Sequence, residues 1–433
     1  MATAAGFAIQ TLGCPKNEAD SDGLARRLRA AGHREVAPGE AALLIVSTCG
    51  FIDAAKEESI AAILGAADFA HARGARVAAV GCLVERYREE LAADLPEVDV
   101  WCGLDTSALL TALSERPAAG EVVRRPAAVR RRPRPVHAFV KISDGCDRAC
   151  AYCAIPLMKG DYETLAPEQV LAAASAALRA GARELVLVGQ DTSRWAQPGW
   201  GGLERLLAEL AALEPAPLWL RLLYLQPEGI DEALLEALAR HAVPYVDVPL
   251  QHASGAVLRR MRRSGDAASF LRLLDNIRSV LPGAAIRSTF IAGFPGETEE
   301  EFGELLDFVG EAGLAAAGVF AFDRQEGTSA AGMECQIDAE VALERVARLG
   351  GAIDDVAARY WQALEGRSLE VLVERGTGSA DGVAVGRCSL QAPDIDGRVM
   401  LTGRRTRRGE LIHAVAVGSV GYDVEAVVRS RIP

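Results

Sequence analysis

Three cysteines close together in the chain constrain its structure more than any other feature. Cys146, Cys150 and Cys153 follow the spacing C-x3-C-x2-C within the stretch 144–159. Thiolates are soft ligands that suit zinc or iron–sulfur clusters. A structural zinc site needs four ligands, and no fourth cysteine or histidine follows nearby. Zinc stays open as an alternative, but three ligands favour an iron–sulfur cluster with one iron left free for another molecule.

Composition limits the partners and the compartment. The 433 residues are 50% hydrophobic and carry a formal charge of −12, which argues against broad nucleic-acid binding because phosphate contacts need a basic surface. The first residues lack the pattern of a secretion signal, and no apolar stretch is long enough to span a membrane. We therefore expect a cytoplasmic protein without membrane contact, in which clustered cysteines are more often metal ligands than disulfides.

Residues 1–118 alternate apolar runs with amphipathic stretches, which predicts a parallel α/β domain of flavodoxin-like type. The expected strands and helices, in chain order, are 6–12, 19–31, 43–47, 54–67, 76–80 and 85–93. Cys14, Cys49 and Cys82 come just after the three strands, at the sheet edge where such folds place their sites. These cysteines are either buried structural residues or the ligands of a second iron–sulfur cluster.

Residues 137–364 repeat a strand–helix pattern six times, which predicts a partial (β/α)6 TIM-like barrel. A full barrel has eight such units. The expected elements, in chain order, are 137–142, 167–180, 184–188, 203–213, 218–224, 231–241, 245–248, 267–281, 284–292, 299–312, 315–320 and 340–364. Sites of such barrels lie at the carboxyl ends of the strands. The cysteine loop, Gln190, Gln251 with His252, and 293–297 all fall there, although His252 alone is more often structural than catalytic.

The remaining segments are a linker and a small β domain. Residues 119–136 are rich in arginine and proline and form either a solvated linker or a basic docking strip. Residues 366–433 contain five short alternating runs, which predict a small all-β, OB-like barrel. We expect Asp394 and Asp396 at a protein-facing or RNA-facing surface, and structural roles for the other cysteines, Cys102, Cys335 and Cys388.

The segments LGCPKNEADS, VSTCGFIDAAKEESI and VGCLVERYREEL, taken with the central cysteine motif, resemble the radical SAM (S-adenosylmethionine) methylthiotransferase family. The resemblance covers nearly the whole chain, and it implies that the β domain is a TRAM domain, often an RNA-binding module. It also implies two 4Fe–4S clusters, an auxiliary one on Cys14, Cys49 and Cys82 and a radical SAM one on Cys146, Cys150 and Cys153. Implied SAM contacts are Tyr152, Gln190, Gln251 and Gly293.

The resemblance implies a reaction as well. One electron from a cytoplasmic flavodoxin or ferredoxin cleaves SAM to methionine and a 5′-deoxyadenosyl radical, which takes hydrogen from an unactivated carbon. A second SAM methylates sulfur at the auxiliary cluster, and the substrate radical takes the methylthio group. In this scheme the cofactors supply the difficult chemistry, while the protein orients them and excludes water.

Several segments point to one branch of the family. CAIPLMKG, VGQDTS, VPLQHAS and IRSTFIAGFPGETEEEF resemble the branch that modifies the β-carbon of an aspartate in ribosomal protein uS12. Glu163, Thr164 and Leu165 stand where family members tend to have Ser-Arg, so this segment is poor in positive charge. The alternatives are a tRNA adenosine methylthiotransferase and a non-catalytic iron–sulfur protein that binds RNA or the ribosome.

Overall fold

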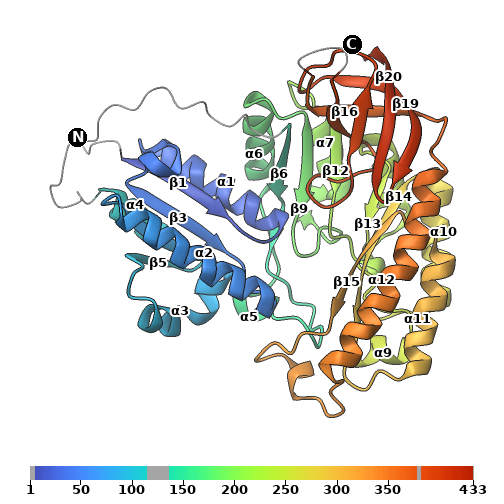
Figure 1. The fold of residues 1–433 in the computed structure, drawn as a ribbon, viewed down its shortest axis with the longest axis horizontal. Helices are drawn as coiled ribbons and strands as arrows, with labels where there is room; N and C mark the ends of the chain where they lie inside the picture. Colours follow the sequence, from blue (N-terminus) through green and yellow to red (C-terminus); the bar gives the residue numbers. More distant parts are fainter. Residues whose placement is uncertain (1–4, 115–135, 378–381, 433) are drawn as a thin grey trace.

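The computed structural model describes residues 5–114, 136–377 and 382–432. They form an amino-terminal α/β domain, a central open barrel and a small carboxyl-terminal β-barrel (Figure 1). The linker predicted at 119–136 lies outside the described residues, apart from its last residue. Within the described ranges, no helix is both long and apolar enough to cross a membrane.

The amino-terminal domain is a five-stranded parallel sheet in the order β2-β1-β3-β4-β5, which confirms the flavodoxin-like prediction. Alternate residues of the fully buried strand β3 point to opposite faces of the sheet. Leu43 and Ile45 pack with α1 and α4, and Leu44 and Val46 pack with α2. The elements are β1 (Gly6–Thr11), α1 (Pro15–Ala30), β2 (Arg34–Glu35), η1 (Pro38–Glu40), β3 (Leu43–Thr48), α2 (Asp53–His71), β4 (Arg76–Gly81), α3 (Cys82–Asp94), β5 (Val100–Cys102) and α4 (Ser107–Ser114).

Helix α1 begins at Pro15, earlier than the predicted 19–31. Proline suits the first helical turn because the N–H that it lacks would have no partner there. The earlier start places Lys16 and Asn17 on the helix, next to Cys14. The sequence did not predict β2 and β5, since strands of two or three residues carry too little periodicity. The eight-residue helix α4 was not predicted either.

Six parallel strands form the central open barrel, as predicted, in two sheets with the orders β12-β9-β6 and β13-β14-β15. Contacts between β12 and β13 join the two sheets. The strands are β6 (His137–Lys141), β9 (Glu184–Val188), β12 (Trp219–Leu222), β13 (Tyr245–Asp247), β14 (Ala285–Ala292) and β15 (Ala316–Ala321). Leu185 and Leu187 pack with the surrounding helices, while Val186 and Val188 belong to the cluster that continues into the carboxyl-terminal barrel.

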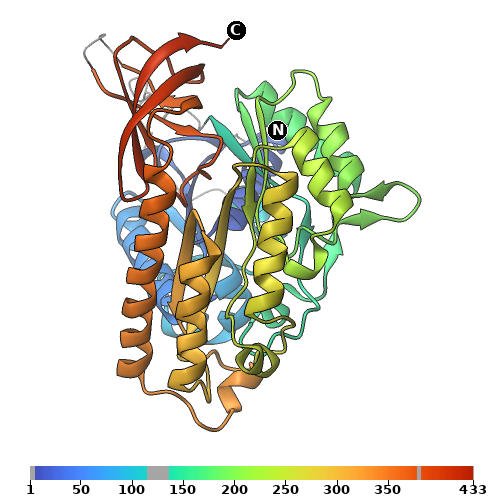
Figure 2. The same ribbon diagram turned by 90° about the vertical axis from the view of Figure 1, so that its right-hand side faces the viewer.

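Helices cover the outside of this barrel, and Figure 2 shows the last three running side by side. They are α6 (Pro167–Arg179), α7 (Leu203–Ala211), α8 (Glu232–His241), α10 (Ala267–Val280), α11 (Glu299–Ala312) and α12 (Ala339–Gln362). Shorter elements lie in the connections: β7 (Ser143–Asp144), α5 (Ile155–Lys159), β8 (Glu163–Thr164), β10 (Ala196–Gln197), β11 (Gly201–Gly202), η2 (Pro227–Gly229), α9 (Gly255–Arg260) and η3 (Ser329–Gly332).

The carboxyl-terminal domain is a closed five-stranded barrel in the order β16-β17-β18-β20-β19, which confirms the predicted small all-β barrel. Its strands are β16 (Ser368–Arg375), β17 (Ala384–Cys388), β18 (Val399–Thr402), β19 (Leu411–Val420) and β20 (Asp423–Arg431). It packs on the amino-terminal ends of the central strands. The Tyr245 hydroxyl at the start of β13 donates to Asp396 (2.7 Å), and His137 at the start of β6 lies 3.4 Å from Asp394.

The structure corrects the expected surface position of Asp396, whose side chain is only 2% exposed. Besides the Tyr245 hydroxyl, it accepts a bond from the Ala392 N–H (2.8 Å). Asp394 does lie at the surface, with 73% of its side chain exposed. Because a buried carboxylate needs hydrogen-bond donors, Asp396 serves domain packing and is unavailable to a partner.

A second buried network ties the two barrels together. Glu184 at the start of β9 accepts from Arg221 of β12 (2.8 Å) and from Arg387 of β17 (2.6 Å). Burial raises the pKa of Glu184, but the two arginines outweigh it and lower the pKa to about 2. Glu374 completes the network by accepting from Arg387 (2.7 Å). The Glu184 carboxylate is therefore charged and paired across the domain boundary.

The three remaining cysteines lie apart from the triads. Cys102 and Cys388 are each 1% exposed and pack in cores, in agreement with the structural role expected for them. Cys335 is exposed and follows η3, with a positive φ of 58°. It therefore contributes no core packing.

Candidate active site

The loop with Cys146, Cys150 and Cys153 follows β6 and is held by main-chain bonds on several sides. Strands β7 and β8 pair across its base, and the Cys146 N–H donates to the Gly160 carbonyl (3.0 Å). Farther along, the Ala151 N–H donates to Met261 (2.9 Å) and its carbonyl accepts from Ala330 (2.8 Å). These bonds fix the three thiols at the carboxyl-terminal rim of the barrel, where the sequence predicts them.

A glycine makes the tight base of this loop possible. Gly145 has a φ of +68°, and a Cβ there would lie 1.9 Å from the Asp161 carbonyl oxygen. Burial raises the pKa of Cys146 and raises that of Cys153 to about 12. All three thiols are free of disulfides. Binding a metal must therefore displace thiol protons at neutral pH, as metal sites built on thiolates require.

Cys14, Cys49 and Cys82 form a second triad at the carboxyl ends of β1, β3 and β4. These strands are neighbours in the sheet, so the topology brings together cysteines that are far apart in sequence. Each thiol lies within electrostatic range of the others, and burial raises the pKa of Cys49 and raises that of Cys82 to about 11. All three are free of disulfides.

The glycines beside these cysteines allow the turns to approach each other closely. A Cβ at Gly13 (φ +87°) would lie 2.7 Å from the Cβ of Cys49, and a Cβ at Gly81 would lie 2.8 Å from the Thr48 carbonyl oxygen. Asn17, which the sequence analysis missed, ties two of the turns together. Its side-chain amide donates to the carbonyls of Leu12 (2.8 Å) and Thr48 (3.2 Å).

The two triads face a shared junction between the domains. Cys82 packs with Ala154 and Met158, which directly follow the first triad. Lys159 of α5 is paired with Asp20 of α1 (3.1 Å). The amino-terminal domain therefore contacts the barrel on the side of the cysteine loop, and Figure 1 shows α5 next to the blue domain.

In the described ranges, no three His, Cys, Asp or Glu side chains converge closely enough to hold one metal ion. Ligands of a single zinc ion lie about 2.0–2.3 Å from it. A 4Fe–4S cluster is wider, because each cysteine binds a different iron. The described residues therefore hold no site for a single metal ion of this kind, but this does not argue against a 4Fe–4S cluster.

The four predicted SAM contacts lie around the rim in different surroundings. The Tyr152 ring packs against the barrel core, and burial raises the pKa of its hydroxyl well above the usual value. Gln190 donates to Asp144 (3.1 Å), and its amide oxygen is buried without a partner. Gln251 has a φ of +70° and bridges to β14 through its main chain. Gly293 has a φ of +75°, and a Cβ there would lie 2.5 Å from Ala342.

His252 and the 293–297 turn have structural surroundings. Glu297 is fully buried and accepts from the Gly293 N–H (3.0 Å) and from Arg345 (2.8 Å). The His252 ring is fully buried too, accepts from the Ser254 N–H (3.0 Å), and lies 3.5 Å from Glu297. These contacts favour the structural interpretation of His252.

The sequence alone did not single out several charged residues at the rim, because nothing in their spacing distinguishes them from other charged residues. Arg263 donates to Gln226 (2.6 Å) and lies 3.9 Å from the Cys150 sulfur. Arg148, inside the cysteine loop, pairs with Asp191 (2.7 Å) and Glu228 (3.0 Å). These pairs anchor the cysteine loop to the loops that follow β9 and β12.

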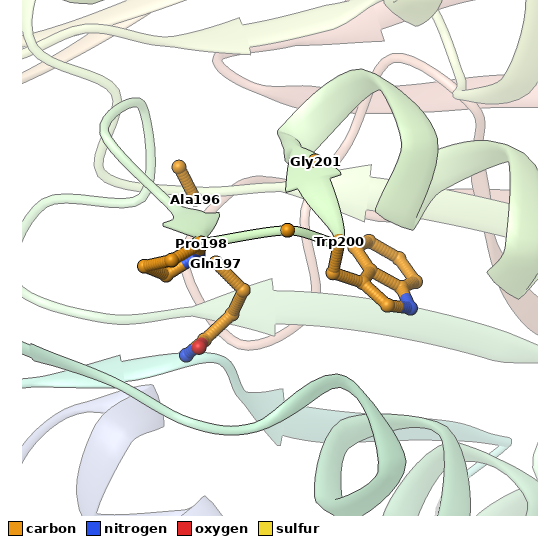
Figure 3. A pocket seen from close by; sticks show the side chains of 6 residues that line it. Ala196, Gln197, Pro198, Trp200 and Gly201 are labelled. Carbon is orange, nitrogen blue, oxygen red and sulfur yellow. The ribbon is translucent and has the colours of Figure 1, made fainter.

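The 163–165 segment has a local structural use. Strand β8 pairs with β7, and Thr164 accepts from the Gln197 amide (2.7 Å) in the hairpin β10–β11. That hairpin surrounds a shallow hollow lined by residues 196–201 alone, with Trp200 on one side and Gln197 on the other (Figure 3). None of the cysteines or predicted SAM contacts lines it.

Comparisons with known proteins agree with this architecture. The radical SAM superfamily matches residues 140–309, the uncharacterized protein family UPF0004 matches 6–103, and the TRAM domain matches 366–428. A ribosomal protein uS12 methylthiotransferase RimO from Desulforudis audaxviator (strain MP104C) is 41% identical over 100% of this chain and 99% of its own length. The chain belongs to the RimO family. A member from Anaeromyxobacter sp. (strain Fw109-5) is 39% identical over 98% of this chain and 93% of its own.

Solved structures share the fold of this RimO-family member at low sequence identity. The radical S-adenosylmethionine methyltransferase TsrM from Kitasatospora setae, with cobalamin and a [4Fe-4S] cluster bound, covers 74% of this chain and 75% of its own, with 15% identity and a TM-score of 0.53. The cobalamin-dependent enzyme OxsB covers 82% of this chain and 56% of its own, with 13% identity and a TM-score of 0.51. These likenesses bear on the fold alone.

Proposed function

We propose that this chain is a radical SAM methylthiotransferase that attaches a methylthio group to the β-carbon of an aspartate in ribosomal protein uS12. The observation that carries the proposal is full-length similarity to enzymes named for this activity. The meeting of two free cysteine triads at one domain junction supports it, because sulfur insertion needs a radical source and a sulfur source close together.

The residues at the two triads fit 4Fe–4S clusters. Each triad offers three thiols outside any disulfide, and thiolates are the usual ligands of such clusters. The lack of a side chain at Gly13 leaves room for Cys49, and Gly81 and Gly145 allow close backbone contacts in the turns beside the cysteines. When bound, the cluster on Cys146, Cys150 and Cys153 supplies the electron that cleaves SAM, and the auxiliary cluster on Cys14, Cys49 and Cys82 supplies the site of sulfur transfer.

The chain's own residues would orient the reactants and shield them. Tyr152, Gln190, Gln251 and Gly293 are our proposed SAM contacts. The main-chain bonds of Ala151 hold the cysteine loop rigidly, which supports a fixed position for the reacting groups. The amino-terminal domain would exclude water from the junction and protect a reactive radical.

We also propose the partners and compartment of this activity. The electron donor would be a flavodoxin or ferredoxin, and the TRAM domain would contact ribosomal RNA beside uS12. Since both the donor and the ribosome are cytoplasmic, we place the enzyme in the cytoplasm. The domain limits that we propose are 1–118, 137–364 and 366–433.

Mass spectrometry of both candidate substrates tests the proposal. In a strain that lacks this protein, uS12 should lose the mass of one methylthio group, about 46 Da, and regain it when the gene is restored. Loss of the group from tRNA, with uS12 unchanged, would show that the enzyme is a tRNA methylthiotransferase instead. Full cluster loading without SAM cleavage under reduction would favour a non-catalytic protein.

A further inference from the structure

Lys16 has an unusual position for a lysine. It directly follows the Cys14-Pro15 turn, on the first turn of α1, and it is half-buried at the junction of the amino-terminal domain and the barrel. Its ammonium group lies 3.4 Å from the centre of the Tyr224 ring, just after β12. No carboxylate of the described residues pairs with it. Tyr224 itself has a φ of +63°, which an L-residue adopts only when its surroundings enforce it.

Most other cations at the junction already have carboxylate partners. Arg287 pairs with Asp247 (3.0 Å), and Lys159 pairs with Asp20 (3.1 Å). Lys141 pairs with Asp144 (2.5 Å). Arg148 is bound by Asp191 and Glu228. Arg263 and Arg86 have no carboxylate partner, but they are held by the side-chain amides of Gln226 (2.6 Å) and Gln325 (2.9 Å). Among the described residues, a carboxylate brought into this junction would therefore find Lys16 as a cation that neither a carboxylate nor an amide side chain already holds.

Lys16 lies near cysteines of both triads. Besides Cys14, its neighbour in sequence, Lys16 lies within electrostatic range of Cys49 in the auxiliary triad. It also lies within electrostatic range of Cys153 in the radical SAM triad. A group bound at Lys16 would thus lie near cysteines of both triads.

We propose that Lys16 binds the side-chain carboxylate of the substrate aspartate and so selects an acidic side chain over a neutral one. This inference rests on the function proposed above. The carbon to be modified is bonded directly to the carboxylate carbon, so a cation that holds the carboxylate also fixes the reacting carbon. Tyr224 would hold the ammonium in place through its ring face and its hydroxyl.

Binding measurements with two forms of the substrate test this role. The probes are purified uS12 and uS12 in which the modified aspartate is replaced by asparagine, titrated against the cluster-loaded protein with SAM present. Because a charge-assisted hydrogen bond is worth about 1.5–3 kcal/mol, the unaltered protein should bind the aspartate form about tenfold to a hundredfold more tightly. Lys16→Met should bind the two forms within about twofold of each other, and Lys16→Arg should keep part of the preference.

Lys56→Met is the matched control. Lys56 also lies over a tyrosine ring, that of Tyr87 (5.3 Å), but it is already paired with Asp53 (2.8 Å). This variant should keep the full preference for the aspartate form. Iron and sulfide content of every variant shows whether both clusters are present, and Lys16→Arg remains informative if Lys16→Met loses one.

The outcomes separate this inference from the proposed function. If Lys16→Met keeps the preference, or weakens binding of both forms equally while shifting the cluster reduction potential, Lys16 serves the cluster and the inference is wrong. An unaltered protein that methylthiolates uS12 but binds both forms equally also overturns it and leaves the proposed function intact. An unaltered protein that neither binds nor modifies uS12 overturns both.

Discussion

Replacing Glu184 by glutamine should loosen the contact between the central and carboxyl-terminal barrels. Both oxygens of this fully buried carboxylate are engaged, one by Arg221 in the central barrel and one by Arg387 in the carboxyl-terminal barrel. Glutamine keeps the volume but removes the charge. Its amide NH2 group would also face a guanidinium, which has no acceptor to offer. Arg387 would keep Glu374 as a partner, whereas the buried Arg221 would lose the carboxylate that it pairs with.

The structure sets the size of the effect by two routes. Removing one partner of a buried ion pair costs about 3–5 kcal/mol, because a charge is left buried without compensation. Separately, a folded-state pKa of about 2 against an ordinary value of 4.5 corresponds to about 3 kcal/mol in favour of the charged form. We therefore expect Glu184→Gln to destabilise the carboxyl-terminal barrel by about 3 kcal/mol at neutral pH.

The sign of the pH dependence follows from the lowered pKa. A depressed carboxyl pKa stabilises the folded state fully above the unfolded value of 4.5, and this stability is lost as the pH falls towards 2. The difference between the original protein and the variant should therefore be largest above 4.5 and shrink below it. A difference that grows on acidification would contradict the assignment of the network.

Hydrogen exchange read strand by strand is the appropriate assay, because a chain of three domains need not unfold in one step. Faster exchange should concentrate in β16, β17 and β9. Glu236→Gln, which breaks an exposed pair with Arg240 on α8, is the control and should cost less than about 0.5 kcal/mol. A loss below about 1 kcal/mol for Glu184→Gln would refute the reasoning.

Three further predictions concern the triads. Cys150→Ala should abolish the cleavage of SAM to methionine and 5′-deoxyadenosine, while Cys49→Ala should keep this cleavage and stop methylthio transfer. Chromatography of the products checks both variants, and identical behaviour of the two would contradict the two-cluster assignment. Gly13→Ala should lower the iron and sulfide content of the protein, because the new Cβ would lie 2.7 Å from the Cβ of Cys49. Gly32→Ala should not lower it, because Gly32 has a similar φ but open space around it. Asn17→Ala removes one buried and one part-buried hydrogen bond and should destabilise the amino-terminal domain by about 1–3 kcal/mol. Hydrogen exchange in β1, β3 and β4 measures this loss, and unchanged exchange there would show that these bonds contribute nothing.

Local patterns in the sequence were enough to predict most of the fold. The central helix at Glu299–Ala312 and the strand at Glu184–Val188 appear in the structure with the predicted bounds, because each combines a clear apolar period with distinct ends. Thr298 and Glu301 form a capping box at the helix start. Helix α1 was predicted to start too late, because the residues after Pro15 are polar and only the later turns show an apolar period.

The sequence by itself determined the cysteine spacing, the order of strands and helices, and the family resemblance, because all three depend on neighbouring residues. Only the tertiary structure decided which distant residues meet. Cys82 packs beside Ala154, Lys16 lies over Tyr224, and Asp396 is buried against Tyr245. These contacts join segments that no local period links, and they depend on how the three domains pack against one another.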